Sequence, residues 1–338
     1  MIALIIAGGS GTRLWPLSTP DFPKHLLKIN DDEKSLIQNT YERAKTISED
    51  IFVVSEVSHA EHVKNQLPDL PDQNFIIEPA RRGTASCIAL ALNRIKTLQN
   101  IDEPIAIISA DHYIRDIDGF KYSFEMASKI TQKLDHIVLI GAEPTYPSTG
   151  FGYIKKGQLV DENFSVFSVD SFKEKPDFDT ATKYLKSGNY VWNCGYFVAS
   201  IKTFEKEMKG NAPELYQKYS SLSNEKLDKY LEFENTSIDY ALIEKVNDLL
   251  VIPATFDWMD LGSFNDLAKS VESNEEGNYI LGNVKTDSVT NCYIQNTETK
   301  PIAVIGLDNC VVVNTKDGLL VARKDLSQKV GEISKKLL

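Results

Sequence analysis

The 338-residue sequence has few of the residues that build metal clusters or disulfide frameworks. It contains only four cysteines and five histidines. The cysteines lie far apart and form no C-x-x-C pair, so we expect four buried, small apolar side chains in a reducing cytoplasm. They are Cys87, Cys194, Cys292 and Cys310. The histidines form no Ser/His/Asp or Cys/His arrangement, and His59 and His62 are expected to face solvent from a polar helix.

Long apolar runs and an excess of positive charge are absent too. No apolar run approaches the roughly 18 residues of a membrane span, and the run 1–7 is too short for a signal peptide and has no basic leader. The net charge of −11 argues against a nucleic-acid or membrane partner. Residues 1–30 nevertheless carry three Lys/Arg against one Asp. Because charges are screened over about 8–10 Å, an anion can still bind near the N-terminus.

A glycine-rich loop follows the first apolar run. Residues 2–7 have the length of a strand, and Gly8, Gly9 and Gly11 follow at once. Glycines let main-chain N–H groups approach a bulky anion without interference from a Cβ. Arg13 and Lys24 can neutralise the anion that these groups hold. The segment therefore predicts a phosphate-binding loop, with a glycine-rich turn and incidental cations as the alternative.

Two other phosphate-binding loops do not fit the spacing. A dinucleotide fingerprint needs G-x-G-x-x-G at a helix start, and a Walker loop needs G-x-x-x-x-G-K-[ST]. Here Thr12 and Arg13 follow the last glycine, and the Trp15-Pro16 pair disfavours immediate entry into a helix. A nicotinamide-dependent dehydrogenase is therefore disfavoured.

Strand and helix patterns alternate through residues 1–142, which predicts an α/β fold with a Rossmann-like, mainly parallel sheet flanked by helices. The expected strands are 2–7, 51–55, 75–78, 104–109 and 137–142, and the expected helices are 34–47, 58–67, 84–98 and 117–133. The helix over 84–98 is apolar on most of its circumference and should be deeply buried. Ligands of such sheets bind beyond the carboxyl ends of strands, where the glycine loop, Glu78 and Asp111 all fall.

The pattern changes after residue 150. Residues 150–200 predict an antiparallel extension that carries the second substrate, and helical patterns return at 200–209, 212–221, 224–234 and 237–246. Residues 274–278 predict a boundary between a catalytic domain, 1–276, and a small β-rich domain, 277–338. Short apolar runs over 279–323 are typical of a β-domain or β-helix-like stack, closed by a helix near 325–337. No sequence repeat is clear enough to count.

Seven motifs in order resemble the sugar-1-phosphate nucleotidylyltransferases. They are the glycine loop with Trp15-Pro16-Leu17-Ser18 and Pro23-Lys24, then Glu78-Pro79 with Thr84-Ala85, Ala110-Asp111-His112, Thr149 to Ile154, Glu174-Lys175-Pro176, Trp192 to Gly195, and Asp257 to Ser263. The Trp15 to Ser18 segment resembles the mannose-1-phosphate guanylyltransferases in particular. The resemblance implies the nucleotide-diphospho-sugar transferase fold and synthesis of GDP-mannose and pyrophosphate from GTP and mannose 1-phosphate. Some family members continue into a phosphomannose isomerase domain; isomerase activity is not expected here, and a homodimer is possible.

Nucleotidyl transfer relies on positioning and electrostatics, without a covalent group on the protein. Mg²⁺ prefers oxygen ligands and is typically held by one or two carboxylates and the substrate phosphates. Asp111, at the end of a strand, and Asp260 are the candidate ligands. The alternative for both is an aspartate that caps a helix or a turn.

The remaining site residues follow from the resemblance. Arg13, Lys24 and Lys175 are the candidate catalytic cations, with Lys175 directed to the sugar phosphate. Gly150, Glu174 and Asn193 are expected to contact the sugar, because carboxylates and amides recognise hydroxyls. The expected nucleotide contacts are Ala7, Gly8, Gly9, Gly11, Thr12, Arg13, Glu78, Pro79, Thr84, Ser109 and Asp111.

One departure keeps alternatives open. The family reads Glu-Pro-x-Gly-Arg-Asn-Thr-Ala where this chain has Arg81 for the glycine and Gly83 for the asparagine. A lost amide can remove a hydrogen bond to the base or ribose, and such losses dominate discrimination between similar ligands. Another nucleotide or another sugar 1-phosphate, such as a manno-configured heptose, is therefore an alternative. A non-catalytic sensor of sugar nucleotides is a third, disfavoured by the presence of Arg13, Lys24, Asp111, Lys175 and Asp260.

Overall fold

The computed structural model describes residues 1–9, 11–29, 32–223 and 227–337. Contacts within the chain divide it into two units. The first holds residues 1–8, 40–110 and 114–258, and the second holds residues 9–39, 111–113 and 259–338. Among the described residues, no helix has the length and apolar composition needed to cross a bilayer.

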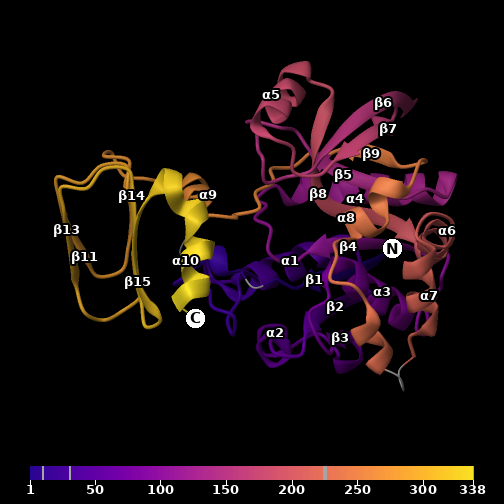
Figure 1. Ribbon diagram of the computed structural model, residues 1–338, viewed down its shortest axis with the longest axis horizontal. Helices are drawn as coiled ribbons and strands as arrows, with labels where there is room; N and C mark the ends of the chain where they lie inside the picture. Colours follow the sequence, from indigo (N-terminus) through magenta and orange to yellow (C-terminus); the bar gives the residue numbers. More distant parts are fainter. Residues whose placement is uncertain (10, 30–31, 224–226, 338) are drawn as a thin grey trace. The chain divides into compact units, whose positions relative to one another are not determined.

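The first unit is built on a nine-stranded sheet (Figure 1). Its strands, in spatial order, are β3 (Phe75–Glu78), β2 (Ile51–Glu56), β1 (Ile2–Ala7), β4 (Pro104–Ser109), β8 (Tyr190–Ser200), β5 (Val138–Ala142), β9 (Leu250–Pro253), β7 (Val166–Lys173) and β6 (Tyr153–Asp161). The first four are parallel to one another, and the five strands expected in residues 1–142 are all present. The antiparallel pairing expected for 150–200 is confirmed, but β8 lies between β4 and β5 in the middle of the sheet, where both faces are buried.

Helices cover the sheet of the first unit. They are α2 (Ala60–Gln66), α3 (Gly83–Ile95), α4 (Ile117–Leu134), α5 (Phe178–Ser187), α6 (Ile201–Asn211), α7 (Pro213–Ser221) and α8 (Ile238–Ala241), with 3-10 turns η3 (Asp72–Asn74), η4 (Leu227–Glu232) and η5 (Ile243–Lys245). Of the helix expected over 224–234, residues 224–226 lie outside the described residues, residues 227–232 form η4, and residues 233–234 are not helical. The short helix α1 (Leu36–Lys45) leads from the second unit into the first.

The alternation of side chains along the strands determines which helices they meet. Ile2 and Leu4 of β1 share one core cluster with α3, whose residues from Ala85 to Leu92 are all buried, as expected. On α4, Phe120 and Phe124 pack against Phe256 and Tyr196 respectively, with ring centroids 5.5 Å apart in both pairs. Helices α3 and α4 thereby bury side chains of the sheet whose strands β1, β3 and β4 precede the glycine loop, Pro79 and Asp111.

One expected surface residue is buried. His59 is only 2% exposed, although His62 is exposed as predicted. The helix α2 begins at Ala60, so His59 occupies its N-cap and does not belong to the polar helical face. The prediction for His59 is therefore wrong because the helix starts later than its sequence pattern.

The second unit contains two small sheets. One has the order β10 (Tyr279–Leu281), β12 (Tyr293–Asn296), β14 (Cys310–Thr315), β15 (Gly318–Arg323), and the other pairs β11 (Val284–Asp287) with β13 (Ile302–Ile305). Tyr293 pairs with Val311 and Val284 pairs with Ile302, both at an offset of 18 residues. Figure 1 shows β11 beside β13. From β11 to β14 the chain therefore coils with a period of 18, a repeat that its sequence does not display, whereas β10 pairs with β12 at an offset of 14.

The glycine-rich segment packs inside this second unit. Leu14 and Trp15 share a core cluster with Phe264 of α9 (Phe264–Ser270) and with Val311 of β14. A Cβ on Gly318 would lie 2.5 Å from the Trp15 ring, so only glycine allows this approach. The expected terminal helix is present as the 3-10 helix η6 (Lys324–Lys329) followed by α10 (Val330–Leu337).

Candidate active site

The glycine loop follows β1 and ends in the 3-10 turn η1 (Thr12–Leu14). Gly9 and Gly11 adopt positive φ angles of 101° and 58°, which favour glycine. A Cβ on Gly11 would lie 2.5 Å from the backbone nitrogen of Lys24, whereas a Cβ on Gly9 would meet nothing within 4 Å in the described part of its unit. The absence of a side chain at Gly11 therefore lets the loop pack closely against the backbone of Lys24. At Gly9 the space beside the backbone is open.

Three predicted site residues, Lys24, Asp111 and Asp260, lie close together. Lys24 opens the turn η2 (Lys24–Leu26), and its side chain is only 7% exposed. Its Nζ lies 3.0 Å from Oδ2 of Asp111 and 3.2 Å from Oδ1 of Asp260, and it also donates to the Asp260 backbone carbonyl. Asp111 lies two residues beyond the end of β4, while Asp260 comes from 149 residues further along the sequence. The structure thus brings the two candidate metal ligands to a single cation.

Charge pairing controls the protonation of this group. Burial alone would favour neutral forms, but Lys24, His112 and Arg13 together outweigh it and lower the pKa of Asp260 to about 2. The pKa of Asp111 is also lowered, because Lys24 and His112 together outweigh burial. The pKa of Lys24 is raised by the two carboxylates, against burial. All three groups are therefore ionised at neutral pH.

Arg13 and His112 complete the surroundings of Asp260. A Cβ on Gly262 would lie 3.3 Å from Nη1 of Arg13, and a Cβ on Gly331 of α10 would lie 2.9 Å from Cγ of Arg13. The two glycines therefore form the slot that holds the arginine side chain. Nε2 of His112 lies 3.9 Å from a carboxylate oxygen of Asp260 and the same distance from one of Asp111. Sequence reasoning assigned no role to this histidine.

The carboxylates suit a divalent cation. Both already converge on one cation, the Lys24 ammonium, and both present oxygen atoms, which Mg²⁺ prefers. In the described part of the chain, no three His, Cys, Asp or Glu side chains group closely enough to hold a metal by themselves. A metal held here would therefore take its further ligands from water and from substrate phosphates.

Asp257 has a structural role that separates it from Asp260. Its Oδ1 accepts the backbone N–H groups of Arg115 and Asp116, and its Oδ2 pairs with the Arg115 guanidinium at 3.0 Å. Although burial opposes ionisation, these donors lower the pKa of Asp257. It anchors the segment that leads into α4.

The first unit carries a group of polar residues around Asn193, at an irregularity in β8. Ile140 of β5 pairs with Tyr196, but the next residue, Gly141, pairs with Asn193, so two residues of β8 bulge out of the ladder. Gly195 within the bulge has a φ of 67°, and its N–H donates to Oδ1 of Asn193 at 3.0 Å. The bulge thus directs the Asn193 amide away from the regular strand.

Glu174 and Lys175 follow β7 and pair with each other. Nζ of Lys175 lies 2.7 Å from Oε1 of Glu174, and the lysine side chain is 57% exposed. Lys175 adopts a φ of 44°, an uncommon conformation for a residue with a side chain. Burial tends to lower the pKa of Lys175, but Glu174 outweighs it and the pKa is raised. Gly150 is exposed, and a Cβ there would touch only Oγ of Ser148, so its backbone is accessible.

The segment expected to bind the nucleotide is fixed by side-chain contacts. Glu78 ends β3, is buried, and accepts a hydrogen bond from the Tyr230 hydroxyl. Burial raises the pKa of Glu78. Oγ1 of Thr84 accepts the backbone N–H of Ile238 at 2.9 Å. The side chains of Glu78 and Thr84 are therefore engaged by the protein. The other predicted contacts here are Ala7, buried at the end of β1, with Gly8, Pro79 and Ser109, which are partly exposed.

The structure explains why this chain has Gly83 at a position where the family pattern has asparagine. Gly83 has a φ of 78°, and a Cβ there would lie 2.2 Å from the carbonyl oxygen of Thr236. The N–H of Ala85 donates to the same carbonyl at 3.2 Å. In this chain the start of α3 therefore packs directly against residue 236, and a larger side chain at position 83 does not fit.

Comparisons with known proteins identify the family. A model described as nucleotidyl transferase matches residues 2–277, and one described as MannoseP isomerase/GMP-like beta-helix domain matches residues 282–337. The mannose-1-phosphate guanylyltransferase RfbM of Salmonella typhimurium is 35% identical over 98% of this chain and 71% of its own length. This chain belongs to the mannose-1-phosphate guanylyltransferase family.

Other mannose-1-phosphate guanylyltransferases and a solved structure support the same family and fold. One from Escherichia coli is 32% identical over 98% of this chain and 75% of its own length. A crystal structure described as mannose-1-phosphate geranyltransferase from Thermus thermophilus is 26% identical and has a TM-score of 0.89. The superposition covers 99% of this chain and 98% of the Thermus chain. The nucleotidyltransferase fold with a C-terminal β-helix-like domain is thereby established.

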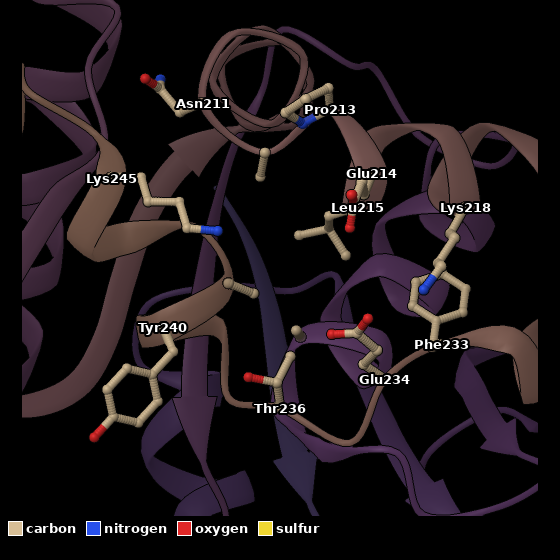
Figure 2. Close-up of a pocket in the computed structure, with 13 residues that line it drawn as sticks. Asn211, Pro213, Glu214, Leu215, Lys218, Phe233, Glu234, Thr236, Tyr240 and Lys245 are labelled. Carbon is tan, nitrogen blue, oxygen red and sulfur yellow. The ribbon is translucent and has the colours of Figure 1, made fainter.

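A pocket of 440 Å³ lies in the helical layer of the first unit (Figure 2). Its lining comes from α3, α6, α7, α8, η5 and the segment before α8, and none of the predicted site residues of this guanylyltransferase-family chain is among them. Ala85 and Tyr240 do line it, and they adjoin Thr84 and Asp239 in sequence. Its lining mixes Lys218 and Lys245 with acids and apolar groups, so it shows no preference for a phosphate.

Sequence reasoning missed Asp239 and Tyr230. Asp239 accepts a hydrogen bond from Asn193, and Tyr230 holds Glu78. Both lie in a stretch that reads as acidic, solvated helix, where 13 acidic residues occur between 221 and 276. Only the serine of Ser237-Ile238-Asp239, which caps α8, gives a local signal of order there.

Proposed function

We propose that this chain makes GDP-mannose and pyrophosphate from GTP and α-D-mannose 1-phosphate. The observation that carries the proposal is the meeting of Lys24, Asp111 and Asp260 beside the glycine loop, in a member of the mannose-1-phosphate guanylyltransferase family. A phosphate oxygen of the sugar phosphate attacks the α-phosphorus of GTP. The bond between that phosphorus and the β-bridging oxygen breaks, and pyrophosphate leaves.

The proposed roles follow the charges that develop. Backbone N–H groups of the loop, with Arg13 and Lys24, hold the β- and γ-phosphates and stabilise the leaving pyrophosphate. Lys175 neutralises the phosphate of the incoming sugar, so that two anionic reactants can approach. Glu174 and Asn193 bind sugar hydroxyls, and the accessible backbone of Gly150 lies beneath the ring.

We propose Mg²⁺ as the metal within a family that generally uses a divalent ion. Asp111 and Asp260 would hold it. The ion supplies charge neutralisation to the phosphates and polarises their oxygens.

A panel of substrates tests the function. Four nucleoside triphosphates are combined with mannose 1-phosphate, glucose 1-phosphate and a manno-heptose 1-phosphate, and pyrophosphate release is measured. We expect the highest kcat/KM for GTP with mannose 1-phosphate. A higher value for another pair favours a different transferase, and binding without turnover favours a sensor.

Asn193→Ala is expected to weaken sugar selection more than nucleotide binding. The amide hydrogen-bonds a hydroxyl, and a hydrogen bond to a neutral group is worth about 1 kcal/mol. The KM for mannose 1-phosphate should therefore rise about fivefold or more, with the KM for GTP nearly unchanged. Steady-state kinetics with each substrate varied in turn measures this, and equal losses for both substrates contradict the placement.

We further propose a catalytic domain over residues 1–276 and a β-rich domain over 277–338, in a cytoplasmic protein. The family models, which change between residues 277 and 282, support the boundary. Four free cysteines, as expected of a reducing compartment, support the location.

A homodimer through the second unit is also proposed. The edge strand β15 exposes Leu319 and Val321 by 56% and 59%, and α10 exposes Ile333 and Leu337. Exposed apolar side chains along an unpaired edge favour association. Sedimentation should give a dimer for the parent and a monomer for Val321→Asp; a monomeric parent contradicts the proposal.

A further inference from the structure

Glu174, Lys175, Asn193 and Asp239 form a group of polar side chains in the first unit. The proposed function gives a role to the first three and none to Asp239. It lies in the first turn of α8, after the N-cap Ser237. Its Oδ1 accepts a hydrogen bond from Nδ2 of Asn193 at 2.8 Å. The helix that carries it is itself tied to α3, because the Ile238 N–H donates to Thr84. Asp239 is therefore a fixed acceptor placed against the Asn193 side chain.

Both ends of the Asn193 amide are fixed by the protein. Nδ2 donates to Asp239, and Oδ1 accepts the N–H of Gly195 from the bulge of β8. An amide can donate on one side and accept on the other, so these two contacts determine which side is which. One N–H and one lone pair are left for a ligand, in a fixed order in space.

A second carboxylate stands close to Asp239. Burial, together with the nearby Glu174 carboxylate, raises the pKa of Asp239, while Asn193 and Lys175 act in the opposite direction. Glu174 in turn holds Lys175 at 2.7 Å. Two acids, one amide and one lysine thus form a compact group, in which the lysine pairs with one carboxylate and the amide with the other.

We propose that Asp239 is a positioning residue that sets the orientation of the Asn193 amide and thereby decides which hydroxyl configuration of the sugar is accepted. The inference rests on the proposed function, since it concerns the sugar of that reaction. Without Asp239 only the Gly195 N–H still orients the amide, so turning the amide over, which exchanges its donor for its acceptor, costs less. A sugar whose hydroxyl points the other way is then bound nearly as well.

A double-mutant cycle tests this proposal. Asp239→Ala, Asn193→Ala and the double variant are assayed with mannose 1-phosphate and glucose 1-phosphate at saturating GTP. We expect Asp239→Ala to reduce the preference for one epimer about tenfold or more, as for loss of a hydrogen bond to a charged group. The KM for GTP should stay within about twofold. The double variant should be no worse than Asn193→Ala alone, because Asp239 acts through that residue.

Two further variants separate the proposed role of Asp239 from misfolding and from a general effect of removing an acidic residue. Asp239→Asn keeps an oxygen that accepts the same hydrogen bond, so most of the epimer preference should return even if Asp239→Ala folds poorly. Asp179→Ala, an exposed acid in the first turn of α5, should change nothing. Strictly additive losses in the cycle overturn the proposal. So does an Asp239→Asn variant that is folded but as unselective as Asp239→Ala. A parent protein that releases no pyrophosphate at all contradicts the proposed function instead.

Discussion

Replacing Asp111 by asparagine is expected to lower turnover about 100- to 1000-fold while leaving the fold intact. Asn has the same shape and retains an oxygen that can accept from Lys24, which now lies 3.0 Å from the carboxylate. It lacks the negative charge that makes a carboxylate a much stronger ligand for Mg²⁺ than an amide. The loss should therefore appear in kcat at saturating substrate, and the thermal unfolding midpoint should change by only a few degrees.

A neighbouring residue provides the control for Asp111→Asn. Asp118 is exposed in the first turn of α4 and undergoes the same chemical change in Asp118→Asn. Its kinetics should match those of the parent. If Asp111→Asn turns over at a near-normal rate, Asp111 does not hold the metal.

Lys24→Ala is expected to reduce kcat about 100-fold, because the charge on the departing pyrophosphate is no longer cancelled. The structure adds a second expected effect. Lys24 lies between Asp111 and Asp260, so its removal leaves two half-buried carboxylates without their cation. In the absence of nucleotide, this variant should bind Mg²⁺ more tightly than the parent, and millimolar Mg²⁺ should raise its unfolding midpoint more.

Lys28→Ala provides the matched control, since Lys28 lies four residues away and is exposed. It should behave as the parent in both kinetics and metal binding. Titration calorimetry with Mg²⁺ alone decides the second effect. Unchanged kinetics in Lys24→Ala contradict the role in leaving-group stabilisation, and weaker Mg²⁺ binding contradicts competition between Lys24 and the metal.

The pH dependence of Lys24→Ala has a defined sign. The pKa values of Asp111 and Asp260 are lowered in the fold, so their contribution to stability is complete above the ordinary carboxylate pKa near 4 and is lost as pH falls through the lowered values. The pKa of Lys24 is raised, so its contribution persists through neutral pH. The difference in unfolding midpoint between parent and variant should be largest near neutral pH and should shrink toward about pH 2–3.

The first half of the fold could be predicted because its elements are local. The strands up to residue 142 are continuous apolar runs, and α3 is apolar on nearly every side. By contrast, α5 was missed although Asp177 caps its start and Gly188 ends it in a left-handed conformation. The aromatic, strand-like stretches on both sides of it obscure its pattern. The position of β8 in the middle of the sheet depends on pairing with β4 and β5, which no local pattern encodes.

The candidate site also combines residues that could be named from the sequence with contacts that only the folded chain shows. The candidate metal and phosphate residues were named from a glycine-rich loop, from a carboxylate near a strand end and from the resemblance to a known family, and their roles stay predictions. That Lys24 would join Asp111 to Asp260 could not be predicted, since the contact spans 236 residues of sequence. Asp239 was hidden for another reason. Its surroundings are rich in acids, and only the folded chain shows that this one accepts from Asn193.

The slot around Arg13 links the far end of the chain to its beginning. Gly331 of α10 lies against the arginine stem, and the Ser334 hydroxyl donates to the carbonyl of Thr12. Heat or a protease that loosens only this last helix would therefore release the arginine while the nine-stranded sheet is still intact. Inactivation of the protein should then precede its melting, and a preparation can lose its catalytic power while its circular dichroism still looks native.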